Sequence, residues 1–384
     1  MKLGRGTIAL LAATAGIAVA NLYYNQPLLP EIAHDLGITP KQAALVPSMT
    51  QVGYGLGILL IAPLGDQLER RRMMMGLLMV VAASLAAIAA SSRLETVAGF
   101  SLTMGMTCIL AHVILPYVGQ NAPPEQRGKL VGQILSGVLI GILLSRTLSG
   151  AVGHYLGWRA VFALASGVAI GLMVVVRTFL GESRGAGKLT YLQILGSMRR
   201  LFLEQPVLRE ACGVGAAMFG AFSSFWSTLA FRLAESPYHM GSREAGLFGL
   251  IGAVGAMAAP LVGKLADKRG SRYVIGVAIA LVAASFALMG ATDGSLPWLV
   301  VGVIVMDLGV QAAMVSNQAR IYGLVPGSES RLNAIYMVVY FAGGSLGSSL
   351  AARAWEAGRW PGVVGCALGF VAFGSVAHWR GRQR

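Results

Sequence analysis

A carboxylate, Asp307, stands near the middle of the apolar run 296–319, where an ionisable side chain is costly to bury in a membrane. Gln311 follows four residues later and Gln318 lies on a similar face, so a helix over this run would carry a polar stripe. A carboxylate in a partly dry cavity can bind and release a proton. The alternative is a structural role as a hydrogen-bond or ion-pair partner.

Two further titratable side chains lie inside apolar runs. Arg146, in the run 130–152, can bind an anionic group, pair with Asp307, or extend toward the outer surface of a membrane. His112, in the run 96–118, can carry a proton or act as a hydrogen-bonded packing residue.

Polar and aromatic side chains form a third group of candidates. They could bind a polar or aromatic substrate, or they could close and pack the helix ends. The candidates for substrate binding, besides Arg146 and Gln311, are Asn21, Tyr24, Asn25, Phe222, Trp226 and Tyr336.

The composition indicates a membrane protein. Hydrophobic residues make up 55% of the chain, charged residues only 12%, and the mean hydropathy is +0.68. Soluble domains carry roughly 25% charged residues. Apolar runs of about 20 residues predict twelve membrane-spanning helices. These runs are 7–30, 42–64, 73–91, 96–118, 130–152, 159–180, 208–231, 245–265, 273–291, 296–319, 332–354 and 361–379.

The distribution of basic residues predicts the orientation. If both termini lie in the cytoplasm, 22 of the 30 Lys and Arg residues fall on that side and 7 on the other. Such an asymmetry is typical of cytoplasmic loops. It accounts for the net charge of +14 without a nucleic acid partner.

Several chemistries lack their usual motifs. The three cysteines lie in apolar runs, which predicts buried thiols rather than disulfides or a metal cluster. The sequence contains no GxxxxGK[ST], HExxH or CxxC motif. We therefore expect no cofactor, no metal and no ATPase of the chain's own.

One short element occurs twice. APLGDQLERR (62–71) and GKLADKRGSR (263–272) each end an apolar run, and their aspartates, Asp66 and Asp267, are 201 residues apart. A repeat at half the chain length predicts two homologous bundles.

Both copies resemble the loop motif of the major facilitator superfamily. The second copy matches at Gly263, Asp267, Gly270 and Arg272. The first copy keeps Asp66, Arg70 and Arg71 but has Ala62, Gln67 and Glu69 at three motif positions. The resemblance implies an all-α membrane fold of twelve helices in two pseudo-symmetric bundles, 1–185 and 207–384. Residues 186–206 would form a cytoplasmic linker with a surface helix. It also implies a latch between the bundles made by Asp66, Arg70, Arg71, Asp267 and Arg272.

Other segments resemble bacterial drug and sugar efflux permeases of this superfamily, including the arabinose-efflux-like members. NLYYNQPLLPEIA (21–33) and YLGWRAVFALA (155–165) resemble parts of their first and sixth helices. Gly128, Gly137 and Gly141 are spaced as in the fifth helix of drug–proton antiporters. However, Ile142 replaces the expected proline, Ser145-Arg146 replaces a glycine pair, and Ser101 replaces the expected arginine of the fourth helix.

The resemblance implies a secondary active transporter in the bacterial inner membrane, with a small-molecule substrate and no enzymatic activity. We expect a monomer that exports amphipathic or sugar-like compounds in exchange for protons, with Asp307 and His112 as proton sites. One alternative is an importer or uniporter of a small anionic metabolite that binds Arg146. An alternative of another class is a polytopic membrane enzyme or receptor.

Overall fold

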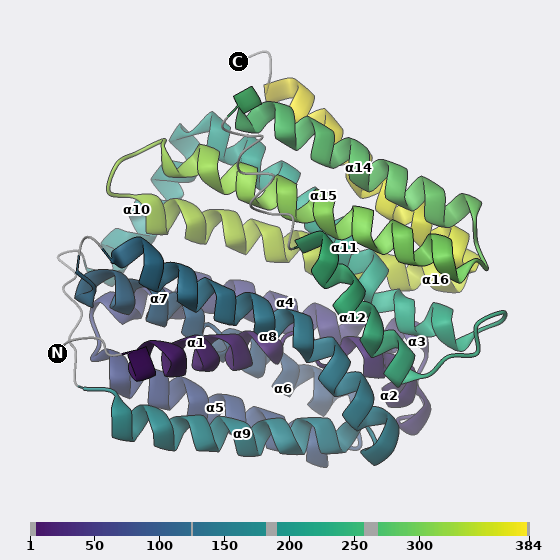
Figure 1. Ribbon diagram of the computed structural model, residues 1–384, viewed down its shortest axis with the longest axis horizontal. Helices are drawn as coiled ribbons and strands as arrows, with labels where there is room; N and C mark the ends of the chain where they lie inside the picture. Colours follow the sequence, from purple (N-terminus) through teal and green to yellow (C-terminus); the bar gives the residue numbers. More distant parts are fainter. Residues whose placement is uncertain (1–4, 124–125, 182–189, 257–267, 382–384) are drawn as a thin grey trace.

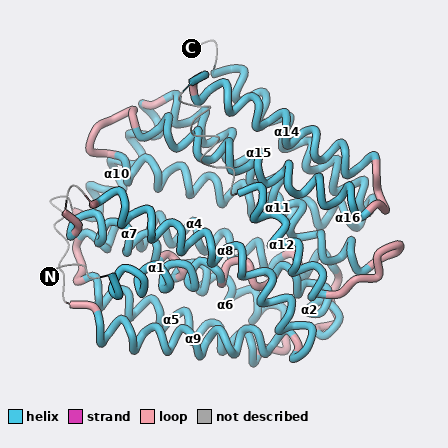
Figure 2. Tube along the Cα trace, in the orientation of Figure 1, coloured by secondary structure: helices cyan, strands magenta, loops and turns pink. Residues whose placement is uncertain are grey.

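The computed structural model describes residues 5–123, 126–181, 190–256 and 268–381, and all regular structure in them is helical (Figures 1 and 2). The first half contains α1 (Arg5–Ala20), η1 (Gln26–Leu28), α2 (Leu29–Asp35), α3 (Pro40–Ala43), α4 (Leu45–Leu56), η2 (Gly57–Ile61), η3 (Ala62–Asp66), α5 (Arg70–Ala90), α6 (Leu94–Thr107), α7 (Leu110–Asn121), α8 (Arg127–Leu156) and α9 (Trp158–Phe179). Then follow α10 (Tyr191–Glu204), α11 (Pro206–Ala234), α12 (Ser242–Ala256), α14 (Ser271–Ala291), α15 (Leu296–Tyr322) and α16 (Glu329–Arg380).

These helices agree with the predicted membrane-spanning runs. Nine helices in the described residues are long and apolar enough to cross a membrane, and Gly6–Ala20 is a shorter apolar helix. One of the nine, α16, has non-helical backbone angles at Gly358 and Arg359, so it supplies the last two predicted runs. The eighth run begins in α12, and its residues 257–265 lie outside the described residues. The predicted all-helical membrane fold is confirmed.

Several spans are interrupted, and the chemistry of local residues explains where. The first run stops at Ala20, and Asn21 donates from Nδ2 to the carbonyls of Ile17 and Ala18, at 3.0 and 3.2 Å. This side chain satisfies acceptors that a helix end leaves free. The second run widens into a π-helical turn, η2, directly before Pro63, whose ring cannot continue a regular helix.

The helices form two groups, which Figure 1 shows in purple to teal and in teal to yellow. We call residues 5–181 the first bundle and residues 206–381 the second bundle. In the first bundle α1 packs on α8, and a Cβ added at Gly141 would collide with the Gly16 carbonyl. In the second, α11 packs on α16, and a Cβ at Gly343 would collide with the Ala216 carbonyl. Glycines therefore bring these helix backbones into direct contact.

We call the end that holds the start of α1, the end of α16 and α10 the terminal end, and the opposite end the distal end (Figure 1). At the distal end both bundles use an arginine in the same way. Arg159 pairs with Asp35 in the first bundle, and Arg359 pairs with Glu235 at 3.0 Å in the second. The Arg159 guanidinium holds the pKa of Asp35 below its usual range, because it favours the ionised carboxylate.

At the terminal end of the second bundle, one buried carboxylate joins several helices. Glu210 of α11 accepts hydrogen bonds from Arg272 of α14 at 3.0 Å and from Arg320 of α15 at 2.9 Å. His378 of α16 lies 3.5 Å from the same carboxylate. The Glu210 side chain is only 6% exposed, so its charge depends on these cations.

Helix α10 lies at the terminal end, in the segment that connects the bundles. A capping box of Thr190 and Gln193 begins it, and its buried side chains are Ile194, Met198 and Leu201. The hydroxyl of Tyr191 donates to the Leu60 carbonyl at 2.9 Å, and Ser197 accepts from Arg331 at 2.9 Å. The connecting helix is therefore bonded to both bundles.

We predict that Glu210→Gln destabilises the protein by about 1–3 kcal/mol, because the loss of the charge weakens the hydrogen bonds from Arg272 and Arg320. Thermal unfolding of the purified protein in detergent measures the effect. Glu204→Gln is the matched control, because Glu204 is 59% exposed and faces only Arg200 at 3.9 Å. Equal melting temperatures for the two variants would contradict the prediction.

Candidate functional site

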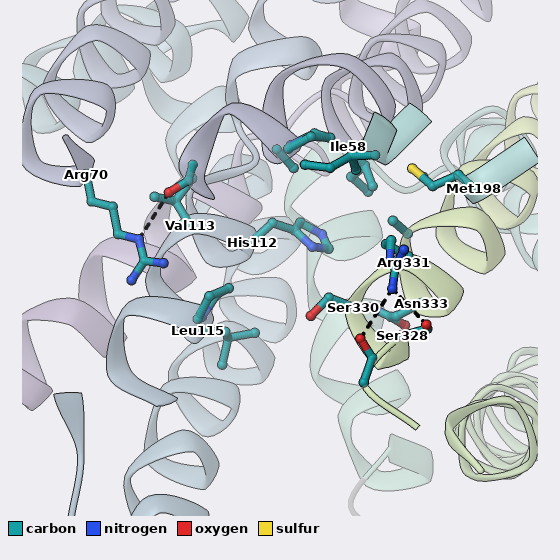
Figure 3. Close-up of a pocket in the computed structure, with 17 residues that line it drawn as sticks. Ile58, Arg70, His112, Val113, Leu115, Met198, Ser328, Ser330, Arg331 and Asn333 are labelled. Atoms are coloured by element: carbon teal, nitrogen blue, oxygen red, sulfur yellow. Dashed lines mark hydrogen bonds between the residues drawn. The ribbon is translucent and has the colours of Figure 1, made fainter. Parts of the chain in front are cut away.

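A cavity of about 420 Å³ lies between the bundles at the terminal end (Figure 3). The first bundle lines it with residues of η2, η3 and α7 and with Arg70 of α5, and the second lines it with the start of α16 and the two residues before it. Helix α10 contributes Ile194 and Met198. Figure 3 shows His112 between Arg70 on one side and Arg331 on the other.

At the distal end the bundles are in contact along two seams. In the first seam, α4 meets α16: the hydroxyls of Ser48 and Ser349 are 2.9 Å apart, and Gln51 donates to Ser348 at 3.4 Å. In the second seam, α8 meets α12: Thr147 donates to the Gly246 carbonyl at 3.0 Å. The bundles therefore meet distally and enclose a cavity at the terminal end.

Arg146 lies at the second seam, on the face of α8 that meets α12. Its Nε donates to Oε1 of Gln26 at 2.7 Å. Its guanidinium carbon lies 4.0 Å from the centre of the Trp226 ring and 4.7 Å from that of Tyr23. The first bundle supplies Gln26 and Tyr23 and the second supplies Trp226, so this buried cation stacks between side chains of both bundles.

Asp307 lies in the middle of α15, and 7% of the residue is exposed. Its Oδ2 is buried and has no hydrogen-bond partner among the described residues. Gly252 of α12 lies against it: a Cβ added there would be 3.1 Å from Oδ2. Helix α12 therefore packs against both residues, with Gly252 against Asp307 and Gly249 against Arg146.

These positions decide between the alternatives for Arg146. The side chain does not extend to a membrane surface, because Arg146 is only 2% exposed. Within the described residues it makes no ion pair with Asp307. Anion binding remains a prediction.

The cavity brings together only part of the predicted site. His112 lines it, and the centre of its ring is 5.9 Å from that of Tyr54. Gln311 is half-buried on α15. Tyr336 is fully buried on α16, where its ring centre lies 5.8 Å from that of Tyr340.

The polar residues after α1 have structural contacts. Asn21 caps α1, as described above, and Asn25 donates to the Thr50 hydroxyl of α4 at 3.4 Å. Tyr24 is half-buried. These contacts support the fold of the first bundle, and a role of the three side chains in substrate binding stays a prediction.

Phe222 and Trp226 of α11 belong to an aromatic cluster. Their ring centres are 6.0 Å apart, and Phe222 stacks on Phe219 at 5.5 Å. Phe219 in turn stacks on Tyr340 at 4.1 Å. The cluster forms an apolar wall beside Arg146.

The latch residues whose side chains the structure describes are Arg70, Arg71 and Arg272, and they lie at the terminal end. Arg70 donates from Nε to the Gly65 carbonyl at 3.2 Å, and Arg71 donates to the Leu180 carbonyl at 3.2 Å. Arg272 bonds Glu210 within the second bundle. The Asp66 side chain and the whole of Asp267 lie outside what the structure describes.

Sequence reasoning missed several residues of this site. Gln26 and Tyr23 hold Arg146, and Arg331 lines the cavity. The sequence offers a weak signal for Gln26, a polar residue inside the segment NLYYNQPLLPEIA. Arg331 counts in the sequence only as one of many basic residues on the terminal side.

Two helical bundles that meet at one end and enclose a cavity at the other have the architecture of a membrane transporter with its site between repeats. The family model of the Major Facilitator Superfamily matches residues 11–352. The chain belongs to the major facilitator superfamily.

Relatives and solved structures agree with this assignment. YgaY of Escherichia coli O157:H7, described as an uncharacterized transporter, is 35% identical over 100% of this chain and 97% of its own length. SCO4007 of Streptomyces coelicolor, described as a probable transporter, is 34% identical over 96% of this chain and 86% of its own length.

Among solved structures, a bacterial homologue of the human lysosomal transporter Spinster, in an inward-facing and occupied conformation, has a TM-score of 0.77 at 15% identity. The match covers 98% of this chain and 96% of that chain. The nucleoside transporter NupG has a TM-score of 0.76 at 14% identity, over 97% of this chain and 98% of its own. These likenesses show the fold.

Family membership makes the chain a secondary transporter and a multi-pass membrane protein. It also confirms that the protein is not an enzyme. The predicted transporter class and superfamily are confirmed.

We predict that cysteines at positions 48 and 349 form a disulfide, because the hydroxyls of Ser48 and Ser349 are 2.9 Å apart in the first seam. Cys108, Cys212 and Cys366 are first replaced by alanine, and a protease site is placed in the linker 182–189. After oxidation and cleavage, the two halves should migrate as one species that a reductant separates. Each single-cysteine variant is the control, and separate halves after oxidation would contradict the distal contact.

Proposed function

We propose that the protein is a proton-coupled exporter of small amphipathic or sugar-like compounds in the bacterial inner membrane. It acts as a monomer by alternating access. Residues 1–185 and 207–384 are the two pseudo-symmetric units that rock around the central cavity, and residues 186–206 join them with a surface helix at the cytoplasmic side. The charge asymmetry of the sequence supports cytoplasmic termini.

The observation that carries this proposal is the cavity at the terminal end, combined with the contact of the bundles at the distal end. With cytoplasmic termini, the cavity faces the side from which an exporter takes its substrate. Rocking of the bundles would break the two distal seams and close the cavity. The hydrogen bonds in the seams join uncharged groups, hydroxyls, an amide and backbone carbonyls, so no ion pair among them has to break in such a change.

Asp307 is the proposed proton site. It is nearly buried, and its Oδ2 lacks a partner among the described residues, so the ionised form has little to compensate its lost hydration. Protonation removes that cost. His112, which lines the cavity, is the second proposed site. One proton that crosses 100 mV supplies about 2.3 kcal/mol.

The remaining predicted residues complete the proposal. Substrate contacts are assigned to Asn21, Tyr24, Asn25, Arg146, Phe222, Trp226, Gln311 and Tyr336. A latch at the cytoplasmic side is assigned to Asp66, Arg70, Arg71, Asp267 and Arg272. The latch residues that the structure describes, Arg70, Arg71 and Arg272, lie at the terminal end. There they could form contacts when the cavity closes.

A second candidate is an importer or uniporter of a small anionic metabolite. The charge of the cavity favours it: among the described lining residues, Arg70, Arg331 and His112 are the titratable ones, and none is a carboxylate. Arg146 would then anchor the anion deeper between the bundles.

We predict that Asp307→Asn abolishes accumulation driven by a pH gradient in proteoliposomes, because the amide cannot bind and release the proton. A panel of dyes, sugars and small acids supplies the substrates. Downhill exchange of the same compounds should persist in the variant. Glu95→Gln, which removes an exposed carboxylate, is the control. The proton-exporter proposal fails if wild-type transport ignores the gradient or if Asp307→Asn matches the wild type.

We predict that Arg146→Gln separates the two candidates. If the substrate is an anion, its uptake falls by about tenfold or more, since a hydrogen bond to a charged group contributes about 1.5–3 kcal/mol. If the substrate is neutral or cationic, its export is spared. Uptake and export are measured in the same proteoliposomes, with Arg93→Gln as the control for loss of an exposed arginine.

A further inference from the structure

We propose that Arg146 and Asp307 bind the two ends of one dipolar substrate, a small molecule with a carboxylate and an ammonium group. This inference rests on the proposed transport function and names its substrate class. It treats the two charges as halves of a single binding site that the ligand completes.

The end of the site at Arg146 lacks acceptors. Arg146 spends one donor, Nε, on Gln26, but its Nη2 is buried without a partner among the described residues. The indole Nε1 of Trp226, whose ring lies 4.0 Å from the guanidinium carbon, is also a buried donor without a partner there. A carboxylate has only acceptor atoms, so it satisfies both donors and neutralises the arginine.

The end of the site at Asp307 lacks donors. Its buried Oδ2 has no partner among the described residues, and an ionised carboxylate can only accept hydrogen bonds. A primary ammonium group offers three donors and a positive charge. The group of the ligand that binds Asp307 is therefore a cation such as an ammonium group.

Arg146 and Asp307 both pack against a third helix, α12, at two different positions. On α12, Gly249 lies against Arg146 and Gly252 lies against Asp307: an added Cβ would be 2.9 Å from the Arg146 Cβ and 3.1 Å from the Asp307 Oδ2. Residues three apart are neighbours on one face of a helix. Glycines at both positions let Arg146 and Asp307 approach the backbone of one face of α12.

The separation of the charges is the decisive observation. Opposite charges buried this deeply normally form a direct ion pair, because each pair compensates the lost hydration of both groups. Arg146 and Asp307 form no such pair in the described structure, and Nη2 of the one and Oδ2 of the other are buried without a partner there. Arg146 belongs to the first bundle and Asp307 to the second, so a dipolar ligand between them also connects the bundles.

The test measures binding to the purified wild-type protein in lipid nanodiscs by titration calorimetry. The probes are ω-amino acids from glycine to 6-aminohexanoate, each with two partners that lack one charge, such as hexanoate and hexylamine for the longest. At least one amino acid should bind about tenfold more tightly than both of its partners, since each charged contact adds affinity. Arg146→Gln should reduce that probe to the affinity of the amine, and Asp307→Asn to the affinity of the carboxylate.

Arg146→Lys is the second variant at the anion end, and it should retain part of the preference because it keeps the charge. Arg93→Gln and Glu95→Gln, both exposed, should bind as the wild type does. The inference is overturned if no probe binds, if the amino acids bind no better than their partners, or if the preference survives both substitutions. If the wild-type protein binds an amino acid more tightly than its two partners but does not accumulate it under a pH gradient, the proton coupling is wrong and the dipolar site stands. The two proposals therefore fail separately.

Discussion

The cost of removing a charge from water is the constraint on which this structure depends. Most charged groups of the described residues avoid it by position: Arg159, Arg359 and Glu210 pair at the helix ends, where water and partners are close. Arg146 avoids it only in part, through Gln26 and two aromatic faces. Asp307 has less still. The incomplete compensation of these two groups marks the centre of the molecule as the place where a proton or a substrate has most to contribute.

Glycines, which have no side chain, also shape the centre of the molecule. Glycines let helix backbones touch within each bundle, as at Gly16 and Gly141, and they also let α8 meet α12 across the bundles. Lipid tails give no hydrophobic driving force for such contacts, so close packing must hold the helices together. Where small residues meet, at the distal end, the bundles touch; at the terminal end larger side chains such as His112 and Arg331 line a cavity instead. Small residues thus accompany the close distal contact in this conformation.

Much of the fold could be predicted from the sequence, because a membrane requires apolar runs of a fixed length. The run 296–319 corresponds to α15, and the two runs after it correspond to α16 with its kink at Arg359. The interruptions could not be predicted as well: the π-helical turn before Pro63 depends on how a local clash is relieved. For the site, Arg146 and Asp307 could be predicted from the sequence because a charged side chain inside a membrane span is costly in free energy. It could not identify Gln26, Tyr23 or the two glycines of α12, since those contacts join residues far apart in the chain.

The two hydrogen bonds of α10 have a mechanical consequence. One end of this helix holds the Leu60 carbonyl of the first bundle, and its middle holds Arg331 of the second. A connecting helix bonded to both bundles resists their separation, because the bundles cannot move apart at this end without the loss of one of these hydrogen bonds. A longer or shorter α10 would alter this restraint without a change to any residue that is proposed to contact the substrate.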